Sequence, residues 1–419
     1  MFVSTDWERA IASKPHRDTR TSSAIVPTNL RARMDINLRR RQLRMQAHNY
    51  KVRAKPCKLT LMREPAKASE IQLHRVRLWL LVAAAMIFLT LIVGGATRLT
   101  ESGMSIVEWK PITGVLPPFS ENEWRSEFGK YQTIPQYREL NRGMSLEAFK
   151  TIYWWEWSHR LLARLTGAVF LLPFLLFLVR GTIPQGLRIR LWGIFAAGAA
   201  LGAVGWWMVS SGLTQGVSVS QYRLAFHLTL ATAIYGAIVW TARQLVTRDA
   251  VEVAARLRFA ALTIAMLLLF QIYLGALVAG LDAGLVYNTW PTIDGAFVPS
   301  AERLWFIEPA WRNLFENTLT VQFQHRMVAY LIWLLAILHA CDAWRRKREF
   351  ASAAMLAGAV TVQAGLGIVT LLHQAPLPLA LAHQILAIIV FTIAVAHAEG
   401  LSHRLTFQLP RSRPVEQGA

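Results

Sequence analysis

The chain has 419 residues, of which 54% are hydrophobic and only 17% are charged, and its formal net charge is +20. Soluble domains carry about a quarter charged residues, so this composition excludes a disordered chain and favours a membrane protein. The charge surplus does not indicate nucleic-acid binding, because a basic N-terminal stretch inflates it. Two cysteines, Cys57 and Cys341, exclude a disulfide scaffold.

Residues 1–73 form that basic stretch, with few acids and no periodic apolar pattern. Three interpretations compete. The stretch is a poorly ordered tail near anionic lipid, a mitochondrial transit peptide, or the product of an over-long reading frame whose true start is an internal residue such as Met62. A cleavable secretory signal is excluded, because the first long apolar run begins only near residue 77.

Eight apolar runs follow, each near the length of about 20 residues that a helix needs to cross a bilayer. They cover residues 77–97, 160–180, 191–211, 222–242, 257–280, 323–343, 351–372 and 377–398. The third and seventh runs are rich in Gly and Ala. Small residues let helix backbones approach closely in lipid, so these two runs predict tightly packed helices.

The short connections between runs predict the orientation. Basic residues dominate the connections after the second, fourth and sixth runs: Arg180, Arg188, Arg190, Arg243, Arg248, Arg256, Arg258, Arg345, Arg346, Lys347 and Arg348. By the positive-inside rule these connections are cytoplasmic, and both termini lie with them. The longer connections, 98–158 and 281–322, carry more acids than bases and are expected outside.

An internal repeat is visible at an offset of about 181 residues. The segment from Glu101 to Trp109 resembles the one from Asp282 to Trp290, and EWSHR at 156–160 resembles QFQHR at 322–326. An even number of spans per copy gives both copies the same orientation. We therefore expect an all-α integral membrane protein with eight transmembrane helices in two parallel four-helix-bundle repeats, 74–250 and 251–403, followed by a tail, 404–419.

Four histidines occupy matching places in these repeats. His159, His227, His325 and His383 lie at the outer ends of the second, fourth, sixth and eighth runs. Each repeat thus places two imidazoles at one depth on two helices, a geometry that can clamp a flat metal macrocycle. Imidazole is a usual axial ligand of haem iron. Four unrelated interface histidines are the alternative, which the matching positions disfavour.

A second histidine pair leaves another interpretation open. His339 and His397 each follow a candidate ligand by 14 residues, a rise of about 21 Å that returns to nearly the same helix face. Diheme quinol-oxidising cytochromes stack two haems with this spacing, but the first repeat has Pro173 and Thr241 there. The pair is either a second haem site or interfacial. The other histidines near the spans are interpreted as solvated or structural: His74, His373 and His403.

Glu156 is the acidic candidate for catalysis. It precedes His159 by three residues, so both share a helix face, whereas the second repeat has Gln322. This asymmetry suggests chemistry in the first repeat and a resident redox group in the second. Alternatively, Glu156 is a helix N-terminal acid stabilised by the dipole. Arg160 and Arg326 follow the histidines and would pair with haem propionates or anchor the helix ends.

Aromatic residues near these positions have expected roles. A cluster before His159 is expected to supply a flat contact surface: Tyr153, Trp154, Trp155 and Trp157. Four outer-loop tryptophans are expected to cover the two sites as lids: Trp109, Trp290, Trp305 and Trp311.

Six strings together resemble one known family. They are GGATRLTESGMSIVEW, EWSHR, SQYRLAFH, GLDAGLVYNTWP, FENTLTVQFQHR and PLPLALAHQ. They resemble haem A synthase, and the resemblance runs from about residue 75 to 400. The chain is more similar to the branch shared by proteobacteria and mitochondria than to the Gram-positive branch, because it lacks that branch's cysteine pair in the outer loops.

The resemblance implies an oxidoreductase that converts haem O to haem A by two hydroxylations of the methyl group at porphyrin position 8, giving a formyl group after loss of water. It implies haem b in the second repeat with His325 and His383 as axial ligands, and substrate haem held by His159 and His227. Glu156 matches the family's acidic residue. Haem O synthase as delivery partner, a homo-oligomer and a bacterial inner membrane, or alternatively a mitochondrial one, are further expectations. A membrane diheme b-type cytochrome carrying electrons from quinol remains the alternative, and a transporter is weaker still.

Overall fold

The computed structural model describes residues 64–111, 113–214, 216–246, 253–347 and 349–402. Nearly all of them belong to one compact unit, Lys67–Ala419. Several predictions lie outside the described residues: those for residues 1–63, for Cys57 and Met62, for His403 and for the tail 404–419.

Within these described ranges, eight helices are long and apolar enough to cross a membrane. They are α2 (Glu64–Leu99), α5 (Leu146–Val179), α6 (Gln185–Thr214), α7 (Gln221–Gln244), α8 (Ala255–Gly280), α12 (Thr318–Arg345), α13 (Phe350–Leu372) and α14 (Leu377–Ser402). The described residues include no strand beyond one isolated bridge, Ile293 to Ala296. The prediction of an all-α membrane protein with eight spanning helices is confirmed.

Most helices follow their apolar runs closely, but α2 and α5 begin earlier. Helix α2 begins at Glu64, although its apolar run begins near residue 77. Helix α5 begins at Leu146, although its apolar run begins only near residue 160. Ser145 caps it by accepting a hydrogen bond from the Ala148 amide. Phe149 and Tyr153 are buried in this early part of the helix, in a small hydrophobic cluster with Trp124. The expected loop therefore ends earlier, because aromatic packing rather than membrane burial begins the helix.

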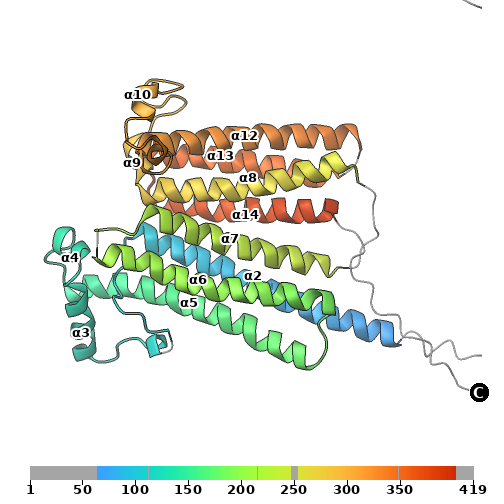
Figure 1. Ribbon diagram of the computed structural model, residues 1–419, viewed down its shortest axis with the longest axis horizontal. Helices are drawn as coiled ribbons and strands as arrows, with labels where there is room; N and C mark the ends of the chain where they lie inside the picture. Colours follow the sequence, from blue (N-terminus) through green and yellow to red (C-terminus); the bar gives the residue numbers. More distant parts are fainter. Residues whose placement is uncertain (1–63, 112, 215, 247–252, 348, 403–419) are drawn as a thin grey trace, which may run out of the picture. The chain divides into compact units, whose positions relative to one another are not determined.

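The spanning helices fall into two groups along the chain (Figure 1). The first helix group comprises α2, α5, α6 and α7, and the second helix group comprises α8, α12, α13 and α14. In the second, α8 and α13 each pack against both α12 and α14. The two histidine-bearing helices, α12 and α14, therefore occupy opposite corners. In the first, α6 packs against α5 and α7, and α2 contacts α5 through a 2.9 Å hydrogen bond from Trp79 Nε1 to the Val169 carbonyl.

The two groups share one continuous interior. A single hydrophobic cluster contains buried residues from all eight spanning helices described. Helix α7 packs against α8 and α14. Near the ends, Gln384 of α14 donates to the Leu91 carbonyl of α2 at 2.8 Å, and Arg98 donates to the Ala279 carbonyl at 2.9 Å. Contacts between helices of both groups thus hold the candidate sites in one framework.

Matching backbone strain follows α2 and α8. Glu101, just after α2, has φ 54°, and Asp282, just after α8, has φ 50°. Non-glycine residues seldom adopt this left-handed conformation. The two positions are those that the sequence offset pairs, so the same turn follows the first helix of each group. This supports the predicted repeat, whose parallel arrangement stays a prediction.

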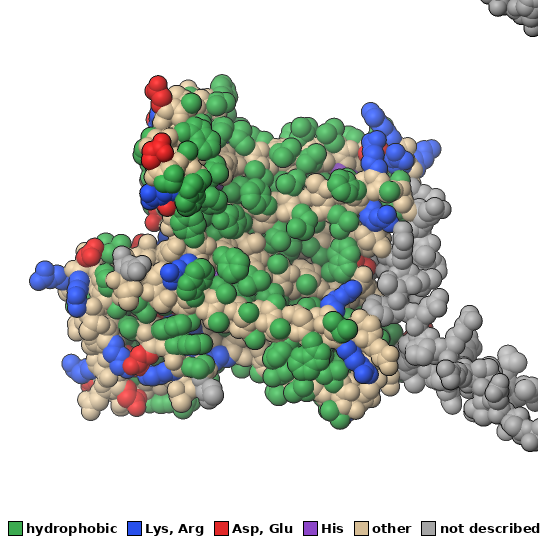
Figure 2. Space-filling model, viewed as in Figure 1, with side chains coloured by type: hydrophobic (Ala, Val, Ile, Leu, Met, Phe, Trp, Pro, Cys, Tyr) green, Lys and Arg blue, Asp and Glu red, His purple; other side chains and the backbone are tan. Residues whose placement is uncertain are grey.

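The short helices α3 (Glu121–Tyr131), α4 (Pro135–Glu139), α9 (Ala283–Val286) and α10 (Ala301–Leu304) gather at one end of the long helices (Figure 1). Ser120 and Glu123 form a capping box that starts α3. In Figure 2 hydrophobic side chains cover the middle of the visible face, while charged side chains concentrate toward the two ends. That distribution suits a bilayer in which the short helices face one aqueous side.

Candidate functional site

The four candidate histidines share one packing arrangement. Each ring lies against a glycine of the preceding spanning helix. In the first helix group, a Cβ added to Gly94 would lie 2.8 Å from His159 Nε2, and one added to Gly205 would lie 3.1 Å from His227 Cε1. In the second, a Cβ added to Gly275 would lie 3.2 Å from His325 Cε1, and one added to Gly367 would lie 2.8 Å from His383 Cε1. At Gly94 and Gly367 only a residue without a side chain permits so close an approach, and at Gly205 and Gly275 a side chain would force the ring to shift by a few tenths of an ångström. Sequence reasoning missed these ring contacts, although the repeat offset that pairs Gly94 with Gly275 was a usable signal.

The depth of the histidines follows from the helix starts. His227, His325 and His383 lie within about two turns of the first residues of α7, α12 and α14. His159 is deeper in its helix, because α5 begins at Leu146. The prediction that every candidate histidine opens its helix is therefore wrong for His159. Its contact with Gly94 nevertheless parallels the contact of His325 with Gly275.

Two glutamines that sequence reasoning also missed hold the rings of the second helix group. Gln271 Nε2 lies 3.0 Å from His325 Nδ1, and Gln363 Nε2 lies 3.1 Å from His383 Nδ1. Each glutamine also donates to the backbone carbonyl of its histidine. Their signal was available, since each is an isolated polar residue in an apolar run, one turn before a ring-contacting glycine.

Glu156 is buried and receives hydrogen bonds on both carboxylate oxygens. Oε2 accepts from Ser105 Oγ and from the Ile106 amide, both at 2.8 Å. Oε1 accepts from Arg160 at 3.0 Å and 2.6 Å. Arg160 also donates to the carbonyls of Ile106 and Glu108. The pair thus fastens the connection after α2 onto the helix that carries His159.

The second helix group has an uncharged counterpart of this unit. Gln322 donates to the carbonyls of Ala283 and Tyr287 at 2.9 Å and 2.7 Å, and its oxygen accepts from Arg326 at 2.8 Å. Arg326 donates further to the Tyr287 carbonyl. Both arginines therefore have loop partners here, and their predicted pairing with propionates stays a prediction. Arg326 Nε is buried and has no hydrogen-bond partner among the described residues.

The aromatic cluster before His159 packs against α3. The Tyr153 and Trp154 rings pack against Trp124 of α3, with ring centroids 4.9 Å and 5.7 Å apart, and Trp157 packs edge-on to Trp154. These contacts anchor α3 to α5. That the cluster forms a flat surface facing the first site stays a prediction.

The four loop tryptophans predicted as lids are exposed: Trp109, Trp290, Trp305 and Trp311. Trp109 stacks on Trp206 of α6 with ring centroids 5.8 Å apart. Trp290 Nε1 donates to the Tyr330 hydroxyl at 2.9 Å. Nearby, Glu108 lies between Lys110 and Lys130, whose hydrogen bonds hold the pKa of its carboxyl below the usual value. The tryptophans' role as lids stays a prediction.

His339 and His397 contact each other directly. Their Nε2 atoms lie 2.8 Å apart, both side chains are buried, and His397 Nδ1 lies 3.0 Å from Ser352 Oγ. A porphyrin has no room between two rings in direct contact. This arrangement argues against a second haem between them, and it leaves the pair as a buried polar link between α12 and α14.

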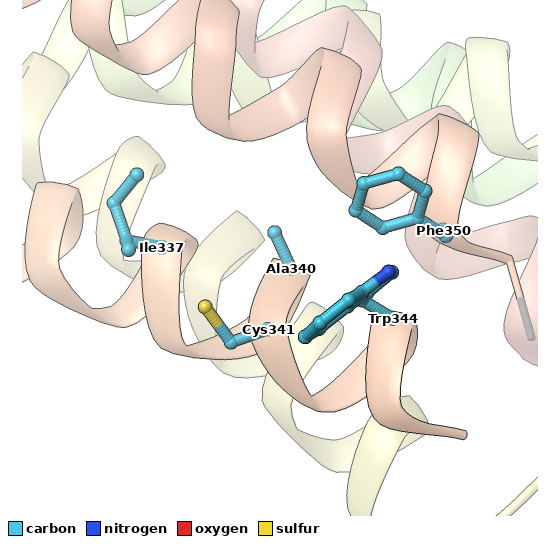
Figure 3. A pocket seen from close by; sticks show the side chains of 5 residues that line it. All are labelled: Ile337, Ala340, Cys341, Trp344 and Phe350. Atoms are coloured by element: carbon cyan, nitrogen blue, oxygen red, sulfur yellow. The ribbon is translucent and has the colours of Figure 1, made fainter. Parts of the chain in front are cut away.

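A separate apolar hollow of about 210 Å³ lies at the junction of α12 and α13 (Figure 3). It is lined by Ile337, Ala340, Cys341, Trp344 and Phe350. Ile337 follows His325 by 12 residues on α12, which corresponds to about 18 Å along the helix. The hollow is therefore not the site that the candidate histidines define.

The histidine arrangement fits axial ligation of a macrocycle better than a bare ion. The described residues contain no group of three or more His, Cys, Asp or Glu side chains that could hold a metal ion. A porphyrin supplies its own four equatorial nitrogens, so only axial ligands must come from the protein. Beside the rings, the buried atoms His227 Nδ1, Gln271 Oε1 and Gln363 Oε1 have no hydrogen-bond partner among the described residues.

Comparisons with known proteins show the family to which the chain is similar. The sequence model of the family described as cytochrome oxidase assembly protein (COX15-CtaA) matches residues 77–395. The chain is 56% identical over 362 residues to a protein of Rhodopseudomonas palustris strain HaA2 named heme A synthase, covering 86% of this chain and 99% of that one. It is 61% identical over 331 residues to the heme A synthase of strain BisB18, covering 79% and 91%. It is 58% identical over 345 residues to that of Bradyrhizobium diazoefficiens, covering 82% and 96%.

Proposed function

The chain belongs to the cytochrome oxidase assembly protein family (COX15-CtaA), and from this premise we propose that it catalyses the conversion of haem O to haem A in a membrane. The observation that carries the proposal is the identity of 56–61% to relatives named heme A synthase over nearly their whole length. Four glycine-backed histidines in two matched helix groups support it, because two sites are needed for a substrate haem and a resident one.

The reaction is an oxidation of the methyl group at porphyrin position 8. Each of two successive hydroxylations replaces one C–H bond by a C–OH bond, and the two electrons that leave this carbon pass to an external oxidant that the chain itself does not supply. The dihydroxy carbon then loses water and becomes a formyl group. The enzyme is accordingly an oxidoreductase.

We assign haem b to the second helix group, where His325 and His383 would hold its iron. These two histidines stand on helices at opposite corners of the group. When bound, haem b supplies a one-electron redox centre. The protein's part is to hold both rings, and the contacts of Gly275, Gly367 and the two glutamines with the rings support this assignment.

The first helix group is assigned to the substrate haem, held by His159 and His227. Glu156 is the catalytic candidate because its buried carboxylate lies one turn from His159, where the second group has an amide. Its hydrogen bonds to Ser105 and Ile106 fix the carboxylate in place. A fixed group beside a bound substrate can orient the reacting methyl. Arg160 and Arg326 are the candidates for propionate contacts.

The membrane setting follows from the same features. An apolar porphyrin is best exchanged within a bilayer, and haem O synthase is the expected delivery partner. We place the chain in a bacterial inner membrane, with both termini cytoplasmic, and a homo-oligomer is the expected assembly. The relatives reported above are bacterial, which supports this location.

The test is to express the chain with haem O synthase in a host that makes no haem A, and to separate the extracted haems by chromatography. We expect haem A together with haem b. Haem b alone, at two per chain, would contradict the proposal and favour the diheme cytochrome.

Substitutions test the haem b ligands separately. Replacing His325 or His383 by Ala should abolish the low-spin absorption bands, because one axial imidazole is lost. His339→Ala is the matched control on the same helix, and it should keep these bands. Full low-spin bands in both ligand variants would show that haem b lies elsewhere.

A further inference from the structure

Two glutamines hold the ring positions of the second helix group in the same way. Gln271 of α8 precedes Gly275 by four residues, and Gln363 of α13 precedes Gly367 by four. Residues four apart lie on one helix face. Each histidine ring is therefore bordered by a glycine and, one turn away, by an amide. Each amide nitrogen donates to the histidine's own carbonyl, at 2.9 Å for His325 and 3.0 Å for His383.

The oxygen atom of each amide makes no hydrogen bond to the described residues. Oε1 of Gln271 and Oε1 of Gln363 are buried, and neither has a hydrogen-bond partner among the described residues. A buried acceptor without a partner is costly, so it is seldom kept without a reason. Here the same atom is unpaired at two matched positions, and in both cases the amide adjoins a ring nitrogen.

The first helix group has no glutamine one turn before its ring-contacting glycines. Thr90 precedes Gly94 by four residues, and its hydroxyl donates to the Met86 carbonyl and lies 3.2 Å from Thr166 Oγ1. Leu201 precedes Gly205 by four residues and is apolar. His227 Nδ1 is buried without a partner among the described residues. The rings of the first group thus have the glycine contact without an amide beside it.

We propose that Gln271 and Gln363 are positioning residues that fix the rings of His325 and His383 for a resident haem, and that Thr90 and Leu201 leave the rings of the first group free to accept and release a substrate haem. The proposal rests on the assignment of haem b to the second helix group. An imidazole that binds iron through one nitrogen carries a proton on the other, and a nearby acceptor orients it. In this structure the amide nitrogen is the atom that lies beside the ring, 3.0 Å and 3.1 Å from the two Nδ1 atoms. Rotation of the amide in the loaded site would turn the unpaired oxygen to the ring as the acceptor.

The experiment compares Gln271→Leu and Gln363→Leu, singly and together, with wild type and with Thr90→Val as the matched control in the first helix group. Three quantities are measured on the purified full chain: haem b per protein, the rate of haem transfer to excess apomyoglobin, and the reduction potential of haem b. Loss of such a second ligand shell weakens metal binding by about 10–100-fold. We expect haem transfer to accelerate by about that factor in each Leu variant and to stay unchanged in Thr90→Val.

Conservative variants separate ring positioning from simple helix packing. Gln271→Glu and Gln363→Glu keep the size and the acceptor but lose the hydrogen bond to the histidine carbonyl. We expect haem b to be retained, because the acceptor that orients the ring stays. A carboxylate acceptor strengthens electron donation by the ring, so the reduction potential should fall. Because the added charge alone also lowers the potential, the ring contact is read from haem transfer as well. Transfer should stay at the wild-type rate in the Glu variants and accelerate in the Leu variants. The reciprocal variant Leu201→Gln should slow release of the substrate haem.

The outcomes are distinguishable. Wild-type transfer rates in the double Leu variant, or an unchanged potential in both Glu variants, would overturn the positioning role. If the Leu variants do not accumulate in the membrane, the Glu variants decide through the potential together with the rate of haem transfer. Retention of haem b in His325→Ala would instead overturn the haem assignment itself, since it does not depend on either glutamine.

Discussion

At the scale of single residues, Glu156 and Gln322 solve the same structural problem with different chemistry. Both receive a hydrogen bond from the arginine four residues later, and both contact the connection that follows the first helix of their group. An amide suffices for this fastening in the second helix group. The first connection presents donors to Glu156, whereas the second presents carbonyl acceptors to Gln322. The carboxylate therefore differs from the amide in its charge as well as in its capacity to accept on both oxygens.

Replacing Glu156 by Gln tests this difference. We expect haem b to stay in the second helix group and haem A production to fall to background, with partially oxidised haem as an accompanying product. The amide has an N–H₂ group where the carboxylate has an accepting oxygen, so the hydrogen bond from Ile106 N–H or from Arg160 would be lost. This loss should cost about 1–3 kcal/mol of stability. The measurement is chromatography of haems extracted from cells that also express haem O synthase. A normal yield of haem A would reduce Glu156 to a fastening residue.

At the scale of helices, glycine positions decide how closely the rings approach. Gly367→Ala would place a methyl group 2.8 Å from His383 Cε1, and the amide of Gln363 restricts the ring from moving aside. Such overpacking costs about 1–3 kcal/mol. We expect haem b per protein to fall severalfold, as read from the absorbance of purified protein.

The matched control is Gly365→Ala on the same helix, where an added Cβ meets no atom within 4 Å. This change should keep haem b and, because Ala favours helix over Gly by about 1 kcal/mol, should not lower stability. Equal haem content in the two variants would contradict the close contact.

An ion-pair cluster of Glu108, Lys110 and Lys130 joins the connection after α2 to helix α3 and makes its stability depend on pH. Lys110 and Lys130 lie 2.5 Å and 2.9 Å from Glu108 Oε2 and lower the pKa of this carboxyl from its ordinary 4.5. A lowered folded-state pKa means that the stabilisation is complete above about pH 4.5 and is lost as the pH falls through the lowered value. The pair is partly exposed, so the effect stays below about 1 kcal/mol.

Hydrogen exchange of α3 measures this effect. After correction for intrinsic rates, exchange in residues 121–131 should be constant between pH 7 and 5.5 and should accelerate below about pH 4.5. Lys130→Met should weaken this acceleration, because one of the two bonds to Glu108 is gone. An acceleration of the same size in the variant would exclude the lysine as the cause.

Sequence patterns predicted the spanning helices well, because a helix that crosses a membrane needs a continuous run of apolar residues. The start of α5 was misplaced because Phe149 and Tyr153 are buried against α3, a partner distant in sequence. The candidate histidines were found from repeat positions. Gly205, Gly367, Gln271 and Gln363 were not, since which side chain borders a ring depends on how two helices face each other, and residue types alone do not state that.

At the scale of the whole molecule, orientation is the prediction that connects both sites to one membrane face. Reporter fusions after residues 185, 250 and 347 should report cytoplasm, and fusions near 120 and 300 should report the outer side. The physical reason is the arginine-rich short connections. The assay pairs alkaline phosphatase, active outside, with a fluorescent protein that folds inside. A reversed result at one position would break the common depth of the four histidines.

The contact of Gln384 with α2 joins the two helix groups at a particular place. Its side chain lies against Gly95 and bonds the Leu91 carbonyl, next to the glycine that meets His159, while its backbone neighbour is His383. One side chain and one helix turn therefore lie between the His159 ring and the His383 ring. If haem in the second site changes the affinity of the first site by some factor, thermodynamic linkage requires the reverse effect to be equal. Haem in the first site would then change the affinity of the second site by the same factor.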